Sequence, residues 1–292
     1  MRTLLKATFA RAAAATGALG RRHAGRLVVL TFHRVRPDGE PAAERPMRAL
    51  ETPASDFRRL LAWMRERCEP LALADWLARE TPPARAAFAV TFDDGWADNA
   101  AHAFPVLREL GIPATIFLAT GAVEDRTPFW WQRAGLADAD IERLKRLAPE
   151  ERAAQLAAYP PAVAAAADFL TWDQVRELGR SGLVRFGAHG HGHGLLDQLP
   201  RAEALADVRR CWELLQANAP DALLPALAWP NGNARGDLAG DLEVLGLRAA
   251  FGTARGAAAV PGAARWNLPR NDVDRNVAQH PGLWNWLLWR AN

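Results

Sequence analysis

Short apolar runs rich in β-branched and aromatic residues recur along the chain, and they alternate with segments whose apolar residues have helical spacing. Runs of this length and composition are typical of buried strands. Their alternation with helices predicts an α/β fold built on a parallel sheet or barrel. The predicted strands are residues 27–32, 87–92, 114–118, 183–187 and 224–229.

Three of the intervening segments carry a clear helical pattern, and we expect helices at 55–67, 171–181 and 201–218. Ser55 and Thr171 are predicted to be the N-caps of the first two, since their hydroxyls can accept a bond from a backbone N–H in the first turn. Helices are expected to end near the glycines at positions 111, 182 and 246, because glycine readily adopts the left-handed conformation of a helix terminus.

The chain shows no repeat and no low-complexity linker, which favours one domain over residues 27–292. Residues of about 121–167 are predicted to form a helical insertion over one face of the core. At the other end, about 274–291 reads as an amphipathic helix, which we expect to pack on the domain rather than on a membrane.

Composition restricts the function. Half of the 292 residues are hydrophobic, which predicts a sizeable core and argues against a disordered chain. With 36 basic against 33 acidic residues, the charge does not support nucleic acid as the main partner. Cys68 and Cys211 are too few for a disulfide framework, and we expect both to be buried small side chains.

Residues 1–26 contain six basic and no acidic side chains. Lys6 and Arg11 interrupt the apolar residues there, so the segment has neither the unbroken run of a secretory signal nor the length of a membrane span. We interpret it as a basic helix or frayed tail, with docking to an anionic membrane surface as the functional alternative. The expected location is cytoplasmic, with peripheral contact at the inner membrane face.

Two adjacent carboxylates, Asp93 and Asp94, directly follow the predicted strand 87–92 and precede Gly95. Active sites of parallel α/β folds gather at the carboxyl ends of strands, although Asp-Asp-Gly alone is also an ordinary turn. Like charges side by side are costly unless a cation or a proton relieves them. These two residues alone do not distinguish a turn from a cation site, so the cation site needs further candidate ligands elsewhere in the chain.

A second cluster is a loop in which three of the seven histidines alternate with glycine: His189, His191 and His193. Glycine leaves the backbone free to aim the rings inward. Two imidazoles four residues apart, together with a carboxylate, suit zinc or another divalent first-row metal with a position left for water. A flexible surface loop without metal is the alternative.

The two clusters belong to a longer series of short motifs along the chain. These are Leu-Thr-Phe-His-Arg-Val at 30–35, Thr-Phe-Asp-Asp-Gly at 91–95, Ile-Pro-Ala-Thr-Ile-Phe at 112–117, Leu-Thr-Trp at 170–172, Gly-Ala-His at 187–189, the His-x-x-x-His pair at 189–193 and Ala-Trp-Pro-Asn-Gly at 228–232. Taken together and in this order, they resemble the motifs of the polysaccharide deacetylase family, the NodB-homology carbohydrate esterases. The resemblance runs from about residue 27 to residue 273 and implies a distorted (β/α) barrel of about seven strands with a metal at its mouth.

Roles follow from the resemblance. It implies that Asp93 is the general base and that Asp94, His189 and His193 bind a divalent metal. Zinc is the default, with cobalt, nickel or iron as alternatives. It also implies that the backbone N–H of Asn231 points at the developing oxyanion.

The sequence departs from the family pattern at two of these places. Gly190 stands where the family has a serine or threonine that braces the histidine loop, and Ala228 stands where it has an arginine. We expect Arg270 to substitute for that arginine and to keep Asp93 ionised. A surface ion pair is the alternative for Arg270.

The general acid is less clearly indicated. His280 is the only late histidine and lacks the Leu-x-His context of the family's acid. We therefore assign the role to His33, with a satisfied core histidine as the alternative and His191 as the next residue to test.

The sequence thus predicts a metal-dependent deacetylase that acts on an acetylated carbohydrate, N-acetyl rather than O-acetyl, either free or lipid-linked. Hydrolysis of a non-sugar amide and glycan binding without turnover are the alternatives. Nothing in the sequence indicates the oligomeric state. Aromatic rings that could stack on sugars are predicted near the site at Trp96, Trp130, Trp131, Trp172 and Trp229, although most of the twelve tryptophans should belong to the core.

Overall fold

The computed structural model describes residues 23–40, 47–161, 168–262 and 264–291. Most of the predicted basic tail, residues 1–22, therefore lies outside the described residues, as does the end of the predicted insertion at 162–167.

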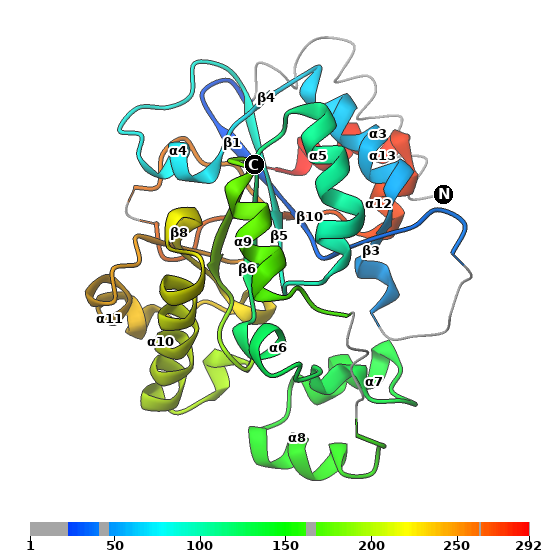
Figure 1. Ribbon diagram of the computed structural model, residues 1–292, viewed down its shortest axis with the longest axis vertical. Helices are drawn as coiled ribbons and strands as arrows, with labels where there is room; N and C mark the ends of the chain where they lie inside the picture. The colour runs from blue at the N-terminus through cyan, green and yellow to red at the C-terminus, as the bar shows by residue number, and fades with distance from the viewer. Residues whose placement is uncertain (1–22, 41–46, 162–167, 263, 292) are drawn as a thin grey trace.

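A curled parallel sheet forms the centre of the molecule (Figure 1). Its strand order in the described residues is β10-β1-β5-β6-β7-β8-β9, and β4 pairs with the first two residues of β5. This confirms the predicted barrel-like α/β fold. Three predicted strands have the expected bounds, and β7 and β8 are each displaced by one residue. The strands of this sheet are β1 (Leu27–Phe32), β4 (Glu69–Pro70), β5 (Ala87–Phe92), β6 (Ala114–Leu118), β7 (Val184–Ala188), β8 (Leu223–Ala228), β9 (Ala249–Phe251) and β10 (Asn271–Asp272), while β2 (Arg34–Arg36) and β3 (Glu51–Pro53) pair separately.

Burial on both faces explains why the central strands are apolar throughout. Every residue of β1 and β5 is buried. Val28 and Leu30 of β1 pack toward the surrounding helices, whereas Leu27 and Val29 point into the concave interior with Phe117 and Phe251. The period of two along a strand thus separates an outer from an inner core.

Helices cover the outer side of the sheet, and a smaller group that includes α7 and α8 lies beyond one end of it (Figure 1). The predicted helix 201–218 is confirmed as α10. The helices are α3 (Ala54–Arg65), α4 (Leu73–Leu77), α5 (Phe104–Leu110), α6 (Thr120–Glu124), α7 (Asp138–Leu144), α8 (Pro149–Leu156), α9 (Trp172–Arg180), α10 (Arg201–Asn218), α11 (Ala239–Val244), α12 (Arg275–Gln279) and α13 (Pro281–Arg290).

One predicted N-cap is confirmed and the other is wrong. The Thr171 hydroxyl accepts a bond of 3.0 Å from the N–H of Gln174, whose side chain in turn accepts from the N–H of Thr171. Ser55, in contrast, lies inside α3, which begins one residue earlier after Pro53. Its hydroxyl and its N–H both donate to Asp38 instead.

Thr171→Ala should therefore lower the free energy of unfolding by about 1 kcal/mol, because the first turn of α9 loses its side-chain acceptor. Ser55→Ala is the matched control and should have a smaller effect, since it removes an exposed hydrogen bond rather than a cap. Urea unfolding of both variants measures the difference. Equal losses would contradict the assignment of the caps.

The C-terminal segment forms two helices where one was predicted. α12 ends at Gln279, and α13 begins at Pro281 after His280. The proline has no N–H with which to continue the preceding helix. Leu283, Trp284 and Leu287 of α13 are buried against the domain. That packing agrees with the role expected for this segment.

Both cysteines are buried and unpaired, as expected. Burial raises the pKa of the Cys68 thiol to about 11 and that of Cys211 to about 12, so both are unreactive thiols at neutral pH.

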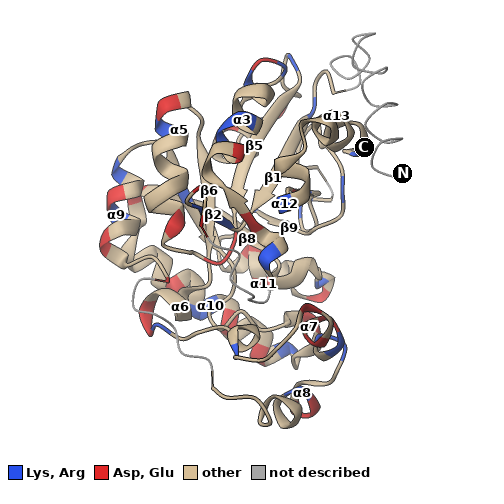
Figure 2. Ribbon diagram, turned by 90° about the vertical axis from the view of Figure 1, so that its right-hand side faces the viewer, with Lys and Arg blue, Asp and Glu red and all other residues tan. Residues whose placement is uncertain are grey.

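The surface mixes charges of both signs. In Figure 2, basic and acidic segments alternate over the same helices, which agrees with the small net charge of the sequence. None of the described helices is both long enough and apolar enough to cross a membrane.

Candidate metal centre and active site

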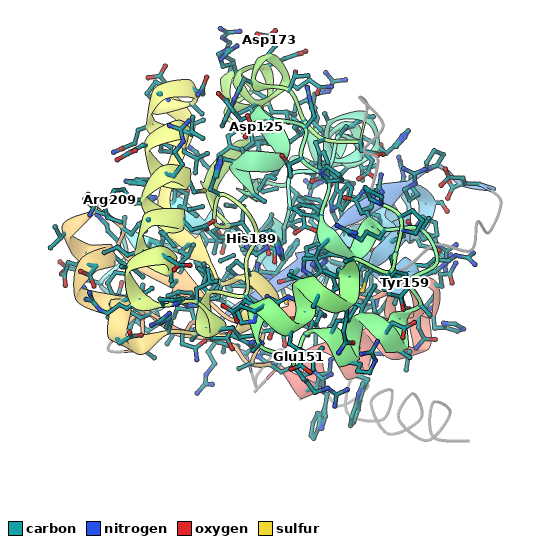
Figure 3. The ribbon with its side chains drawn as sticks, turned by 90° about the horizontal axis from the view of Figure 1, so that it is seen from below. Asp125, Glu151, Tyr159, Asp173, His189 and Arg209 are labelled. Atoms are coloured by element: carbon teal, nitrogen blue, oxygen red, sulfur yellow. The ribbon has the colours of Figure 1, made fainter. Side chains whose placement is uncertain are left out.

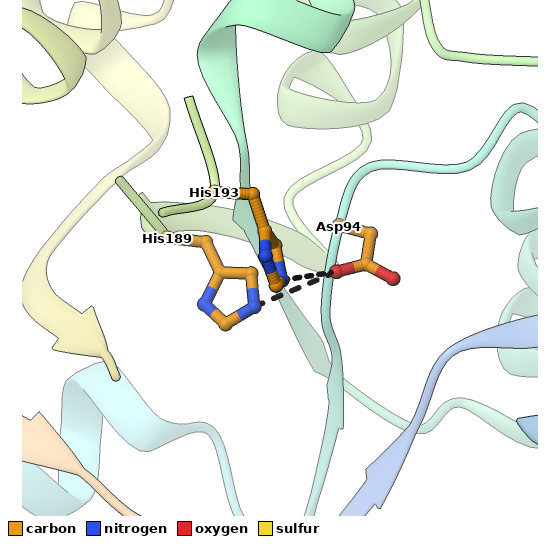
Figure 4. Close-up of side chains that lie close together, drawn as sticks. All are labelled: Asp94, His189 and His193. Carbon is orange, nitrogen blue, oxygen red and sulfur yellow. Dashed lines mark ion pairs between the residues drawn. The ribbon is translucent and has the colours of Figure 1, made fainter. Parts of the chain in front are cut away.

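The predicted metal ligands meet at the carboxyl ends of β5 and β7. Asp94 follows β5, and His189 and His193 lie in the loop that follows β7. The Nε2 atoms of His193 and His189 lie 3.1 Å and 3.5 Å from Asp94 Oδ1 (Figure 4). Among the described residues these three form the cluster whose ligand atoms all lie within 4.8 Å of one another, and His191 does not belong to it.

This arrangement fits a divalent cation. Asp94 Oδ1 is buried and makes no hydrogen bond with any described residue, although two imidazole nitrogens converge on it. An unsatisfied buried carboxylate oxygen is costly. One carboxylate oxygen and two imidazole nitrogens are also the donor set expected for zinc or a related metal.

Neighbouring side chains hold each ligand in place. Trp96 Nε1 donates to the other oxygen of Asp94 at 2.8 Å, and His189 Nδ1 bonds to the Ala228 carbonyl at 2.8 Å. The rings of Trp131 and Phe129 pack on His193, with centroids 4.6 Å and 5.1 Å from its own. Such partners fix the orientation of a ligand and, for histidine, its tautomer.

Burial and the neighbouring carboxylates shift the pKa values of the two histidines in opposite directions. Burial lowers the pKa of His193 below its ordinary value, which favours the neutral form that binds metals. Burial would lower the pKa of His189 as well, but the negative charges of Asp93 and Asp94, both close to its ring, outweigh burial and raise this pKa. A bound cation would take the place of that proton.

Asp93 is held by Arg270 from inside the barrel. The two terminal guanidinium nitrogens of Arg270 donate to the two carboxylate oxygens of Asp93, each at 2.7 Å. Arg270 is fully buried and its Nε donates to the Gly252 carbonyl, so it is no surface ion pair. Burial would raise the pKa of Asp93, but the charge of Arg270, followed by that of His189, more than compensates and lowers it.

A cavity of about 300 Å³ opens over these groups. His33 and Asn231 both line it together with Asp93 and the three candidate ligands, and the seventh predicted site residue, Arg270, contacts the site through its two hydrogen bonds to Asp93. Asn231 has a positive φ of 58°, a conformation that non-glycine residues rarely adopt. An adjoining cavity of about 230 Å³ shares His33 and Asp94.

Some of the expected aromatic residues do not reach the site. Trp96, Trp130 and Trp131 line the two cavities. Trp229 is fully buried with its Nε1 bonded to the Trp266 carbonyl, and Trp172 lies at the start of α9, where it bonds to Glu124. Those two predictions of location are wrong, because a position next to a motif in sequence does not determine on which side of the strand a ring lies.

His191, the alternative candidate for the general acid, lines neither of these two cavities. Its Nδ1 lies 3.0 Å from the Thr120 hydroxyl.

Sequence reasoning missed several residues that line the larger of the two cavities. Residues from distant segments complete the lining. These are Met47 and Leu50 before β3, Glu142 and Lys145 near the end of α7, and Thr253 and Asp272 at the last strands.

Figure 3 views the molecule from the end at which α7 and α8 lie, with His189 near its centre. Glu151 of α8 is labelled in the same view, on the side of the insertion. The candidate metal site thus lies at the end of the sheet that α7 and α8 approach, and Trp130, Trp131 and Lys145, all from the predicted insertion, line the cavity.

Comparisons with known proteins agree with this geometry. The family model described as polysaccharide deacetylase matches residues 80–250, more than half of the chain. The chain is also similar to YxkH of Bacillus subtilis (strain 168), whose name assigns it provisionally to the polysaccharide deacetylases. The identity is 31% over 74 residues, which cover 24% of this chain and only 26% of YxkH.

Solved structures share the fold. The deacetylase PplD of Streptococcus pyogenes, in complex with acetate, has a TM-score of 0.63 at 17% identity, covering 86% of this chain and 94% of PplD. IcaB from Ammonifex degensii has a TM-score of 0.62 at 21% identity, covering 89% and 97%. A de-N-acetylase from Aggregatibacter actinomycetemcomitans has a TM-score of 0.60 at 17% identity, covering 84% and 94%.

Proposed function

Since the chain belongs to the polysaccharide deacetylase family, we propose that it removes acetyl groups from a poly- or oligosaccharide or a lipid-linked saccharide with the help of a bound divalent metal. The observation that carries this proposal is the convergence of Asp94, His189 and His193 beside a carboxylate that Arg270 keeps ionised. The residues proposed as ligands and as base line one cavity together, which argues against a glycan-binding protein without turnover.

Asp94, His189 and His193 would hold the metal, for which zinc is the default. When bound, such an ion makes a water molecule more acidic and polarises a carbonyl oxygen. Asp93 stands beside these ligands, with His189 Nε2 3.9 Å from its Oδ2. Its lowered pKa keeps it ionised at neutral pH, so it can accept the proton of the attacking water while Arg270 holds it in position.

The other two residues act on the acetyl group and on the leaving group. The backbone N–H of Asn231, in the turn after β8, is proposed to donate to the oxyanion; one such donor contributes on the order of 10²–10³ in rate. His33, between β1 and β2, lines both cavities and is proposed to protonate the leaving nitrogen or oxygen. Acetate and a free amine or hydroxyl are the products.

His33→Ala should keep the metal but slow substrates with a poor leaving group far more than activated ones. A sugar amine needs a proton to depart, whereas an activated aryl oxide does not, so the loss of kcat/KM should be about 10²–10⁴ for the first and much smaller for the second. Parallel assays on an N-acetylated oligosaccharide and an aryl acetate measure this. Equal losses would return His33 to a structural role and leave the acid unassigned.

N-acetyl groups on a carbohydrate are the proposed substrate, in line with the structural relative described as a de-N-acetylase. Release of acetate should be measured on matched N-acetylated and O-acetylated oligosaccharides and on small non-sugar amides. Faster release from the N-acetylated sugars is expected. Turnover confined to the small amides would replace this proposal with amide hydrolysis on the same barrel.

The basic residues before position 23 are proposed to bring the protein to an anionic membrane surface, on the cytoplasmic side. Replacing Arg2, Lys6, Arg11, Arg21 and Arg22 with glutamine should weaken binding to vesicles that contain acidic lipid, by about 1 kcal/mol for each residue near the surface. His23 is kept, because it is buried and bonds to the Leu288 carbonyl. Cosedimentation measures the change, and unchanged partition would leave the segment without this role.

A further inference from the structure

The loop that carries two of the proposed metal ligands contains two residues with a positive φ. Gly190 has a φ of 77°, which glycine adopts readily, whereas His193, which is not a glycine, has a φ of 51°. A non-glycine residue in this conformation persists only where surrounding contacts hold it, and such positions occur often at functional sites. The loop 189–193 therefore needs support from outside itself.

Asp207 provides such a contact from the second turn of α10. Its Oδ1 accepts a hydrogen bond from the N–H of His191 and its Oδ2 one from the N–H of Gly192, both at 2.8 Å. Hydrogen bonds to an ionised carboxylate are stronger than those between neutral groups. One carboxylate thus fixes two consecutive peptide groups between the two ligands.

The same contact accounts for the glycine at position 190. A Cβ at that position would lie 2.6 Å from Asp207 Oδ1, which is closer than real Cβ contacts. The carboxylate occupies the space that a side chain of residue 190 would need. Support for the loop at this point therefore comes from α10 and not from residue 190.

Residues of α6 hold the loop through its carbonyl groups. The N–H groups of Thr120 and Gly121 donate to the carbonyls of Gly190 and His191, at 3.2 Å and 2.8 Å. In Figure 3, the labelled Asp125 marks the end of α6 and Arg209 marks α10, and His189 is labelled near the centre of the same view. The amides of the loop bind α10 while its carbonyls bind α6, so losing Asp207 would free one of the two sides.

We propose that Asp207 is a positioning residue of the metal site, which keeps the loop bent so that His189 and His193 both face Asp94. It acts through these ligands, and it lines neither of the cavities over the site. This inference rests on the metal site of the proposed function. It predicts that the affinity for the metal depends on a residue outside the ligand set.

The test compares Asp207→Asn with Glu213→Gln in the full chain. Both variants convert one carboxylate of α10 to an amide, but Glu213 is exposed and Asp207 faces the loop. The asparagine keeps its oxygen for one N–H and presents an N–H₂ group to the other. Zinc titration of metal-free protein against a competing chelator should show a dissociation constant about 10–100 times higher for Asp207→Asn, as for other partners of metal ligands, and close to wild type for Glu213→Gln.

A second pair of variants keeps the test sharp if Asp207→Asn folds poorly. Gly190→Ala should weaken zinc binding in the wild-type background, because the added methyl group collides with Asp207. In an Asp207→Ala background it should add less to the loss, since that collision is gone and only the strain at φ 77° remains. Additive losses would contradict the contact.

The zinc titrations distinguish a failure of the role of Asp207 from a failure of the proposed metal site. Normal zinc binding by both wild type and Asp207→Asn would overturn the role of Asp207 and leave the metal site intact. Failure of the wild-type chain to bind zinc, cobalt, nickel or iron would contradict the metal site itself, and the role of Asp207 with it.

Discussion

Asp93→Asn is expected to bind the metal as well as the wild type does and yet to lose about 10²–10⁴ of kcat/KM, the usual contribution of a general base. The amide nearly keeps the shape of the carboxylate but cannot accept the proton of water at neutral pH. The metal ligands themselves are unchanged. Zinc content and steady-state kinetics on the same preparation measure both quantities.

Stability has to be followed in the same variant, because Asp93 is the partner of a fully buried cation. Replacing it leaves the charge of Arg270 unpaired, and removal of one partner from a buried pair costs roughly 3–5 kcal/mol. The assays therefore belong well below the melting temperature of the variant. Asp173→Asn, an exposed replacement on α9, is the control for the loss of a carboxylate as such. A folded, metal-loaded Asp93→Asn with near wild-type turnover would contradict the assignment of the base.

Removal of any one ligand should abolish tight metal binding. One of three converging donor atoms is deleted in each of Asp94→Ala, His189→Ala and His193→Ala. The loss of metal affinity should exceed roughly 10–100-fold, which is the usual effect of replacing a residue that is hydrogen-bonded to a metal ligand. His191→Ala is the matched control in the same loop. Its ring faces Thr120, so it should keep nearly all of the metal.

Metal content after dialysis and titration with zinc measures these four variants. An empty site in His191→Ala together with a full one in His193→Ala would show that the register of the loop has been misassigned. Loss of metal in all four would indicate that the fold of the loop, rather than the donor atoms, decides binding.

The core of the fold was predictable because its strands are buried on both faces. β1, β5 and β6 appear in the sequence as unbroken apolar runs and were predicted with the observed bounds. β4, β9 and β10 were missed, since each contributes only two or three residues, and a segment that short carries no periodic signal. Their pairing with β5, β8 and β1 depends on tertiary contacts.

Helix ends show the same limit. Thr171 caps α9 as predicted, because both halves of its capping box lie within four residues of sequence. Ser55 looked equally suitable, yet Asp38 offers its hydroxyl and its N–H a carboxylate from another part of the chain. The competing partner could not be identified from the local sequence.

The residues with catalytic chemistry in the site were predictable, but the residues that support them were not. Asp94, His189 and His193 were proposed as ligands because they follow predicted strand ends in motifs that resemble those of the family, and Arg270 was proposed as the substitute for the arginine that Ala228 replaces. Trp96 was expected near the site and does line a cavity there, but its hydrogen bond to Asp94 was not foreseen. Asp207 gave no signal at all, since one acidic residue on an amphipathic helix is typical of a solvent-exposed face.

Acetate release by the stripped and the reloaded wild-type chain tests the central claim most directly. The protein is freed of metal with a chelator, assayed on an N-acetylated oligosaccharide, and assayed again after one equivalent of zinc, cobalt, nickel or iron is added. We predict that acetate release is lost with the metal and returns with at least one of the four ions. Full release by the metal-free protein, or no release from any acetylated carbohydrate after reloading, would contradict a metal-dependent carbohydrate deacetylase.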